Sequence, residues 1–212
     1  MSDTKILVFF ALKEEVAPFL PLLRGRAGIE WAVTGIGREN AERVARQHLN
    51  RTNPELVLTC GFAGGLNPHL AAEAVVFDTE EERLRTRLLA AGARPAKFHC
   101  ADRIAITKAD KAALFAKTGA DAVEMESAII RYLCLARAIP AATVRVISDT
   151  AEEDLPVDFN HLAKPDKSVD LAKLITYVIR RPSLISPLLH LQKRTQAAAV
   201  KLAAVLDQVT RG

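Results

Sequence analysis

The chain has 212 residues, of which 50% are hydrophobic and 25% are charged, and its net charge is +4. These values are typical of a globular chain long enough to form one domain with a buried core. Its basic residues are spread out until the C-terminal third, and aromatic residues make up only 5%. Nucleic-acid-binding domains usually carry a clustered basic patch with interleaved aromatic side chains, so we expect no nucleic-acid partner.

Neither a metal site nor a targeting segment is indicated. The histidines lack metal-ligand spacing and the cysteines lack CxxC spacing, which predicts buried reduced thiols and no metal. We also expect no cofactor, unless inorganic phosphate serves as a co-substrate. The first 15 residues lack a basic n-region and a cleavage site, and no apolar run is long enough to cross a membrane. We therefore expect a soluble cytoplasmic protein. The residues concerned are Cys60, Cys100, Cys134, His48, His69, His99, His161 and His190.

Short apolar segments alternate with amphipathic segments along the chain. The apolar runs predict buried parallel strands, and apolar residues at helical spacing predict helices between them. The expected strands are residues 5–11, 29–37, 54–66, 71–79, a segment just after 102, 121–127 and 141–149. The expected helices are residues 12–23, 39–52, 80–93, one that ends at Gly119, 128–139, and the chain from 170 onward.

This alternation predicts an α/β fold: a single three-layer domain whose mostly parallel, mixed central sheet is flanked by helices. We expect this domain to span residues 1–170 and a helical C-terminal extension to span residues 171–212. Ligands of open α/β sheets bind at the carboxyl ends of the strands. The segments that end the expected strands are therefore candidates for one site.

Two of these segments are rich in glycine, TGIG at residues 34–37 and GFAGG at residues 61–65. Neither matches a dinucleotide-binding or phosphate-binding loop. Such glycines allow close approach of a ligand or simply make tight turns, and the spacing does not decide between these readings.

Carboxylates also follow the apolar strands, where they are costly unless they are hydrogen-bonded or functional. Glu15 and Asp149 would otherwise complement a helix N-terminus or cap a turn. In the segment DAVEMES, Glu124 and Glu126 are two residues apart, so an extended chain points both to one face. Such a pair needs a hydrogen-bond donor, and a sugar diol is one. Met125 between them would pack on the apolar face of the sugar.

Five segments carry a resemblance to a known family: ALKEEV, TGIGRENA, GFAGGLNP, DAVEMESAII and VRVISDTAEED. In this order and spacing they resemble the nucleoside phosphorylase/nucleosidase superfamily, above all its methylthioadenosine/S-adenosylhomocysteine nucleosidase branch. The resemblance covers residues 5–155. The C-terminal part is similar to hopanoid-associated phosphorylases, which implies adenosylhopane as substrate. The resemblance thus implies cleavage of the N-glycosidic bond of an adenine nucleoside.

The resemblance also implies roles for single residues. Asp149 would hold or relay the proton that the departing purine takes at N7, and Ser148 would orient it. Glu15 would activate the attacking water. Glu126 would clamp the ribose 2′- and 3′-hydroxyls, with Met125 and Glu124 beside it. Residues near the base or its backbone contacts would be Ala63, Gly64, Phe62 and Ile104.

The sequence departs from the family in three respects. Residues 78–100 are shorter than the corresponding nucleosidase segment, which would leave the 5′ side open and puts the quaternary structure in doubt. Phe62 stands where we expect a smaller polar residue.

Phosphorolytic relatives usually carry an arginine just before the segment that corresponds to GFAGG, and this chain has none there. Arg38 is therefore the candidate phosphate ligand, unless it is only a solvated helix-start residue. Because Glu15 would repel phosphate, we expect water rather than phosphate as the acceptor.

Apolar and basic residues interleave in the tail, residues 179–209. Its helices either pack on the domain or on a second subunit, or form a basic amphipathic surface for anionic lipid. The second reading places the protein at the membrane as a peripheral enzyme. A general methylthioadenosine/S-adenosylhomocysteine nucleosidase and a non-catalytic nucleoside-binding or membrane-associated module remain alternatives. The resemblance also implies a homo-oligomer.

Overall fold

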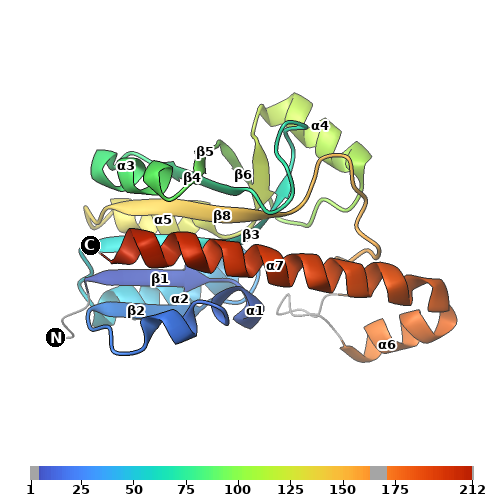
Figure 1. Cartoon of the computed structure of the whole chain (residues 1–212), viewed down its shortest axis with the longest axis horizontal. Helices are drawn as coiled ribbons and strands as arrows, with labels where there is room; N and C mark the ends of the chain where they lie inside the picture. Colours follow the sequence, from blue (N-terminus) through green and yellow to red (C-terminus); the bar gives the residue numbers. More distant parts are fainter. Residues whose placement is uncertain (1–4, 163–170, 212) are drawn as a thin grey trace.

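A computed structural model describes residues 5–162 and 171–211 of the chain. A mixed sheet with the strand order β2-β1-β3-β8-β4-β5 forms its centre, and β7 and β6 continue from β3 at one end (Figure 1). The strands are β1 (Ile6–Phe10), β2 (Ile29–Val33), β3 (Leu56–Gly65), β4 (Val75–Thr79), β5 (Arg94–Pro95), β6 (Phe98–Cys100), β7 (Ala122–Glu124) and β8 (Ala141–Asp149). The four strands β2, β1, β3 and β8 are parallel, and β4 runs antiparallel to β8.

Helices cover both faces of the sheet, as the alternating pattern predicts. The α-helices are α1 (Lys13–Val16), α2 (Arg38–Arg51), α3 (Glu82–Ala90), α4 (Lys108–Thr118), α5 (Ser127–Leu135), α6 (Leu171–Arg180) and α7 (Ile185–Thr210), and the 3-10 helices are η1 (Leu20–Leu23) and η2 (Pro182–Leu184). The expected three-layer α/β fold with a mostly parallel mixed sheet is confirmed.

The side chains of β1 belong to two hydrophobic clusters, one on each face of the sheet. Successive side chains of a strand point to opposite faces. Leu7 and Phe9 accordingly lie in a cluster with α2 and α5, whereas Val8 and Phe10 lie in a cluster with the C-terminal part of α7. A continuously apolar strand is therefore required here, because both of its faces are buried.

Two elements differ from the expectations. The helix expected at residues 12–23 is interrupted because Pro18 has no N–H to continue it, and α1 ends at Val16. The strand expected just after residue 102 is absent among the described residues, and β6 forms earlier instead. The cause is local: the backbone N–H and C=O of Ile104 bond to the side chain of Asn160, and the Ile106 carbonyl accepts from Leu155.

The segment GFAGG also differs, because it continues β3 instead of making a turn. Its residues pair with β8, with a bulge between Ala63 and Gly64, and then with β7. The glycines therefore serve close approach of neighbouring groups within the sheet.

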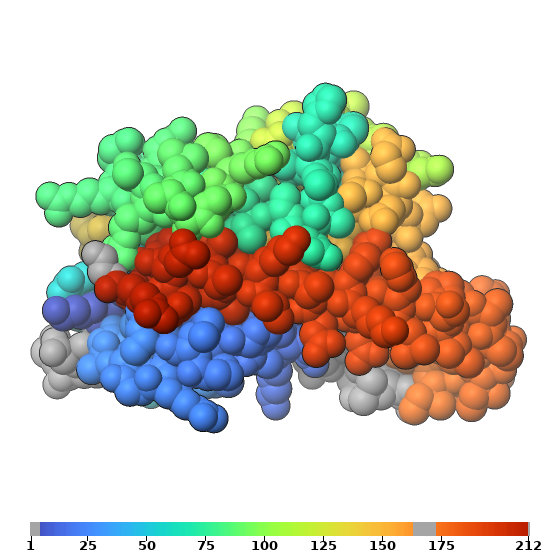
Figure 2. Space-filling model, in the orientation of Figure 1, coloured from blue at the N-terminus to red at the C-terminus, as the bar shows by residue number. Residues whose placement is uncertain are grey.

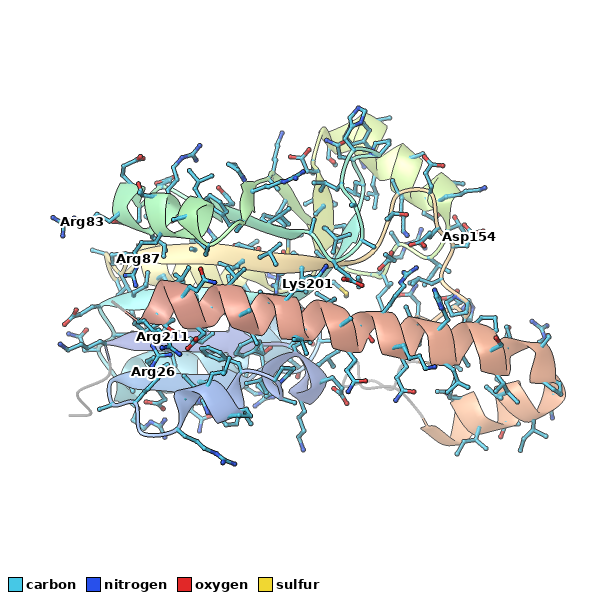
Figure 3. All side chains as sticks on the ribbon, in the orientation of Figure 1. Arg26, Arg83, Arg87, Asp154, Lys201 and Arg211 are labelled. Atoms are coloured by element: carbon cyan, nitrogen blue, oxygen red, sulfur yellow. The ribbon has the colours of Figure 1, made fainter. Side chains whose placement is uncertain are left out.

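The long helix α7 crosses one face of the sheet (Figure 1), and its surface forms a continuous band across that side of the molecule (Figure 2). Its C-terminal half belongs to the core, since Leu202 and Leu206 have no exposed surface. Figure 3 shows Arg26 close to the end of α7, where it pairs with Asp207 at 3.0 Å. The boundary expected at residues 170/171 falls at the edge of the described residues, but this half of α7 completes the sheet's cover.

Replacement of Leu202 by Ala tests this contribution. We expect a loss of about 2–5 kcal/mol in the free energy of unfolding, because the change leaves a cavity between α7 and the sheet. The control is Leu189→Ala on the same helix, where the side chain is 52% exposed and the expected change is within about 0.5 kcal/mol. Chemical denaturation measures both, and equal small losses would contradict a structural role for this half of α7.

Candidate functional site

Glu15 is buried at the first turn of α1, directly after β1. Its Oε2 accepts hydrogen bonds from the backbone N–H groups of Ala11 and Leu12, and its Oε1 accepts from Phe62, each at 2.8 Å. Burial raises the pKa of Glu15 to about 7, although Arg145 and these N–H groups act to lower it. A carboxylate with this pKa can take up a proton near neutral pH.

Arg145 is the fully buried cation beside this carboxylate, and the sequence analysis did not single it out. It lies in the middle of β8, opposite Gly61 of β3. Its Nη2 is 2.5 Å from Glu124 Oε2 and 3.5 Å from Glu126 Oε2. Burial acts to lower the pKa of Arg145, but Glu124, Glu126 and Glu15 more than offset this and raise it.

The two acids of the EME segment both reach Arg145, but the protein uses them differently. Glu124 also accepts from the Ser127 hydroxyl at 2.7 Å and from the backbone N–H groups of Glu126 and Ser127. Burial acts to raise the pKa of Glu124, but Arg145 and these donors hold it below its ordinary value. Glu124 is therefore occupied in holding the start of α5 and Arg145.

Glu126 accepts fewer hydrogen bonds from the protein than Glu124 does. Its Oε1 accepts from the Gly37 N–H at 2.8 Å, and the contact of its Oε2 with Arg145 is long. Burial raises the pKa of Glu126, with Glu124 adding to the shift and Arg145 opposing it. This carboxylate therefore keeps lone pairs for further donors, and Met125 beside it is buried.

Asp149 ends β8, opposite Gly64 of β3. Its Oδ1 accepts from the Ser148 hydroxyl at 2.6 Å, and that hydroxyl also lies 3.3 Å from the Ala63 carbonyl. A Cβ on Gly64 would come within 3.4 Å of Asp149 Oδ2. The structure thus brings Asp149, Ser148, Ala63 and Gly64 together.

Lys111 is the second cation that sequence reasoning missed. It comes from α4, has no exposed surface, and places Nζ 2.5 Å from Asp149 Oδ2. Its position inside an amphipathic helix gave no signal. Arg145, by contrast, is a charge within the apolar run of a buried strand, and this pattern could have revealed it.

The remaining predicted residues lie around this cluster. Phe62 is half-buried and donates its N–H to Glu15, while Ile104 is held by Asn160. Arg38 is exposed at the start of α2, next to the Gly37 N–H that binds Glu126. The strand-end segments therefore converge as expected. Within residues 5–162 and 171–211, no group of three His, Cys, Asp or Glu side chains is arranged to hold a metal ion.

Parts of this chain match known proteins in sequence. Residues 81–180, which include Glu126 and Asp149, match the family model of the Phosphorylase superfamily. A 5′-methylthioadenosine/S-adenosylhomocysteine nucleosidase of Glaesserella parasuis is 30% identical, over 60% of this chain and 70% of that protein. The chain belongs to the phosphorylase superfamily.

Solved structures share the fold of this superfamily member. The futalosine hydrolase of Helicobacter pylori has a TM-score of 0.73 at 17% identity, over 97% of each chain. The 5′-methylthioadenosine/S-adenosylhomocysteine nucleosidase of Neisseria meningitidis has the same TM-score and identity, over 98% of this chain and 99% of that chain. At this identity the likeness concerns the fold, including the C-terminal helix.

The close packing of Glu15 and Arg145 predicts that Gly61 tolerates no side chain. Its φ is +143°, and an added Cβ would lie 2.5 Å from Glu15 Oε1 and 2.8 Å from Arg145 Nη1. We expect Gly61→Ala to reduce the free energy of unfolding by about 1–3 kcal/mol through overpacking, in addition to the cost of its backbone conformation.

The control is Gly92→Ala. Gly92 also has a positive φ, +85°, but nothing lies within 4 Å of an added Cβ. This variant therefore carries only backbone strain. Thermal or chemical denaturation compares the two variants, and equal losses would show that Gly61 matters only for its backbone conformation.

Proposed function

We propose that the protein hydrolyses the N-glycosidic bond of an adenine nucleoside. The single observation that carries this proposal is the buried carboxylate of Glu15, with its pKa at about 7, next to the lightly held carboxylate of Glu126. A base after β1 and a diol acceptor after β7 are thereby present, and both of these strands pair with β3. The superfamily membership and the named activity of the nucleosidase relative support the same reaction.

Each side chain has a role in this reaction. Glu126 accepts hydrogen bonds from the 2′- and 3′-hydroxyls of the ribose, and Met125 packs against the sugar. Glu15 takes a proton from the water that attacks C1′, where positive charge develops as the bond to the base breaks. Asp149, oriented by Ser148, delivers a proton to N7 of the departing adenine. Glu124 holds Arg145 and the start of α5.

Water rather than phosphate is proposed as the acceptor. The cluster already contains three carboxylates, Glu15, Glu124 and Glu126, around the single guanidinium of Arg145. Addition of a phosphate dianion would increase the repulsion in a buried site of low dielectric constant. Arg38 at the site's edge is the residue that would have to bind phosphate instead.

The 5′ substituent is proposed to be a hopanoid, as in adenosylhopane. Exposed apolar side chains on α6 and α7 support a lipid contact: Ile175, Ile179, Ile185 and Leu189. Residues 171–206 contain six Lys or Arg and no Asp or Glu, which suits an anionic membrane surface. A groove of about 570 Å³ lies between residues 157–162 and α6. None of the described helices is long and apolar enough to cross a membrane.

Two further parts of this proposal concern the cell and the assembly. We propose a cytoplasmic enzyme that contacts the inner face of the membrane through α6 and α7. A homo-oligomer is proposed from the family resemblance alone, and light scattering on the purified protein tests it.

Adenine release is the direct test. We expect the protein to release adenine from adenosylhopane in detergent, without phosphate, and Asp149→Asn to lower this rate at least about 100-fold while the fold is retained. Methylthioadenosine, S-adenosylhomocysteine and adenosine are assayed in parallel, each with and without phosphate.

The other outcomes are equally informative. Release from the small thioether nucleosides alone would replace the hopanoid with methylthioadenosine and S-adenosylhomocysteine as substrates. A requirement for phosphate would overturn hydrolysis. No release from any nucleoside would leave a non-catalytic nucleoside-binding module.

The rate should also depend on pH through Glu15. A general base works only when ionised, so the rate is expected to fall about tenfold per pH unit below the Glu15 pKa of about 7 and to level off above it. Glu15→Gln should abolish this dependence together with most of the rate. The exposed neighbour Glu14 provides the control: Glu14→Gln should keep the full profile. An unchanged acidic limb in Glu15→Gln would remove Glu15 as the base.

A further inference from the structure

The ammonium group of Lys111 has a complete set of partners. Its Nζ lies 2.5 Å from Asp149 Oδ2, 2.8 Å from the Thr150 carbonyl and 2.7 Å from the Glu153 carbonyl. An ammonium has three N–H donors and no acceptor, so each donor meets one acceptor. The side chain has no exposed surface, and a charge buried this deeply persists only when it is paired and hydrogen-bonded.

These contacts fix the carboxylate of Asp149 from two sides. Ser148 donates to Oδ1 and Lys111 donates to Oδ2, so the carboxylate cannot rotate without the loss of a hydrogen bond. The backbone that follows Asp149 is held as well, because Arg194 of α7 donates to the Ser148 carbonyl at 2.8 Å and pairs with Glu153. A cation from α4 thus reaches the proposed acid directly.

We propose that Lys111 is a positioning residue for Asp149 and that it supplies, through this carboxylate, the proton taken up by the leaving adenine. This inference rests on the proposed function, since it concerns the same bond cleavage. It assigns a role to a residue of α4 that no other part of the mechanism uses.

Protons, electrons and charge are all conserved in this step. The electron pair of the C1′–N9 bond moves to the purine, and a water oxygen forms the new bond to C1′. Glu15 takes the proton of that water. A proton passes from Lys111 to Asp149 and from Asp149 to N7, so Asp149 is a carboxylate before and after the step. Lys111 ends as a neutral amine and Glu15 as a carboxylic acid, so the total charge is unchanged, and exchange with solvent resets both groups.

Two variants test this role. Lys111→Met keeps the unbranched side chain but removes all three donors and the charge. Lys111→Gln keeps two N–H donors on a side chain one atom shorter but carries no ammonium. We expect both to lower kcat for an adenine nucleoside at least about 100-fold, the range of general acid catalysis, with KM changed less than about threefold. Lys117→Met, at an exposed position of the same helix, should match the wild type.

A substrate whose leaving group needs no proton separates proton supply from structure. Para-nitrophenyl β-riboside has the same sugar but releases a stable phenolate. We expect the Lys111 variants to cleave it at close to the wild-type rate. Equal losses on both substrates, or a wild-type rate on the adenine nucleoside, would overturn the inference. If the wild type does not cleave the phenyl riboside, kcat and KM decide: a KM that rises with the loss of rate overturns it.

The experiments distinguish a failure of the proposed function from a failure of the role of Lys111. A wild-type protein that releases adenine from no nucleoside overturns both proposals, whereas an active wild type with unaffected Lys111 variants overturns only the role of Lys111. Where Lys111→Met does not fold, Lys111→Gln carries the test, because it keeps two N–H donors at this position.

Discussion

The guanidinium of Arg145 is the group on which the site depends. It lies without exposed surface among Glu15, Glu124 and Glu126, and three carboxylates this close could not remain buried without it. The removal of one partner from a buried ion pair typically costs about 3–5 kcal/mol. Arg145 therefore determines both the stability of this part of the sheet and the order in which its carboxylates take up protons.

The geometry of the sheet is matched to this cation. Gly61 provides the space beside Arg145, and the bulge between Ala63 and Gly64 brings β3 opposite Asp149. On the other side of Arg145, Glu124 accepts a hydrogen bond from the Ser127 N–H at the start of α5. The glycines of β3 thus leave space for the charged groups to pack. Larger residues at these positions would be compatible with the strand but not with the site.

Much of this could be predicted from the sequence, for physical reasons that differ between elements. Buried strands such as β1 are visible because both faces require apolar residues, and the helix that ends at Gly119 has a left-handed C-cap that favours glycine. The convergence of Glu15 and Asp149 follows from parallel strands ending at one edge, whereas Glu126 follows the end of β7, which runs antiparallel to β3.

The parts that could not be predicted depend on contacts between distant segments. The pairing of Lys111 with Asp149 joins residues 38 positions apart, and nothing in the local pattern of α4 marks one lysine as buried. The irregular backbone at Ile104 depends on the side chain of Asn160. The donor that the protein itself provides to Glu124 and Glu126, Arg145, comes from the middle of β8 and was not recognised in the sequence.

The position of α7 also bears on how the chain reaches its folded state during synthesis. The face of the sheet that contains Val8 and Phe10 is covered by residues 198–210, almost two hundred positions later. A ribosome makes this sheet strand by strand while the cover does not yet exist. The emerging chain must therefore keep a broad apolar face shielded, by transient contacts or by a chaperone, until the end of α7 leaves the exit tunnel.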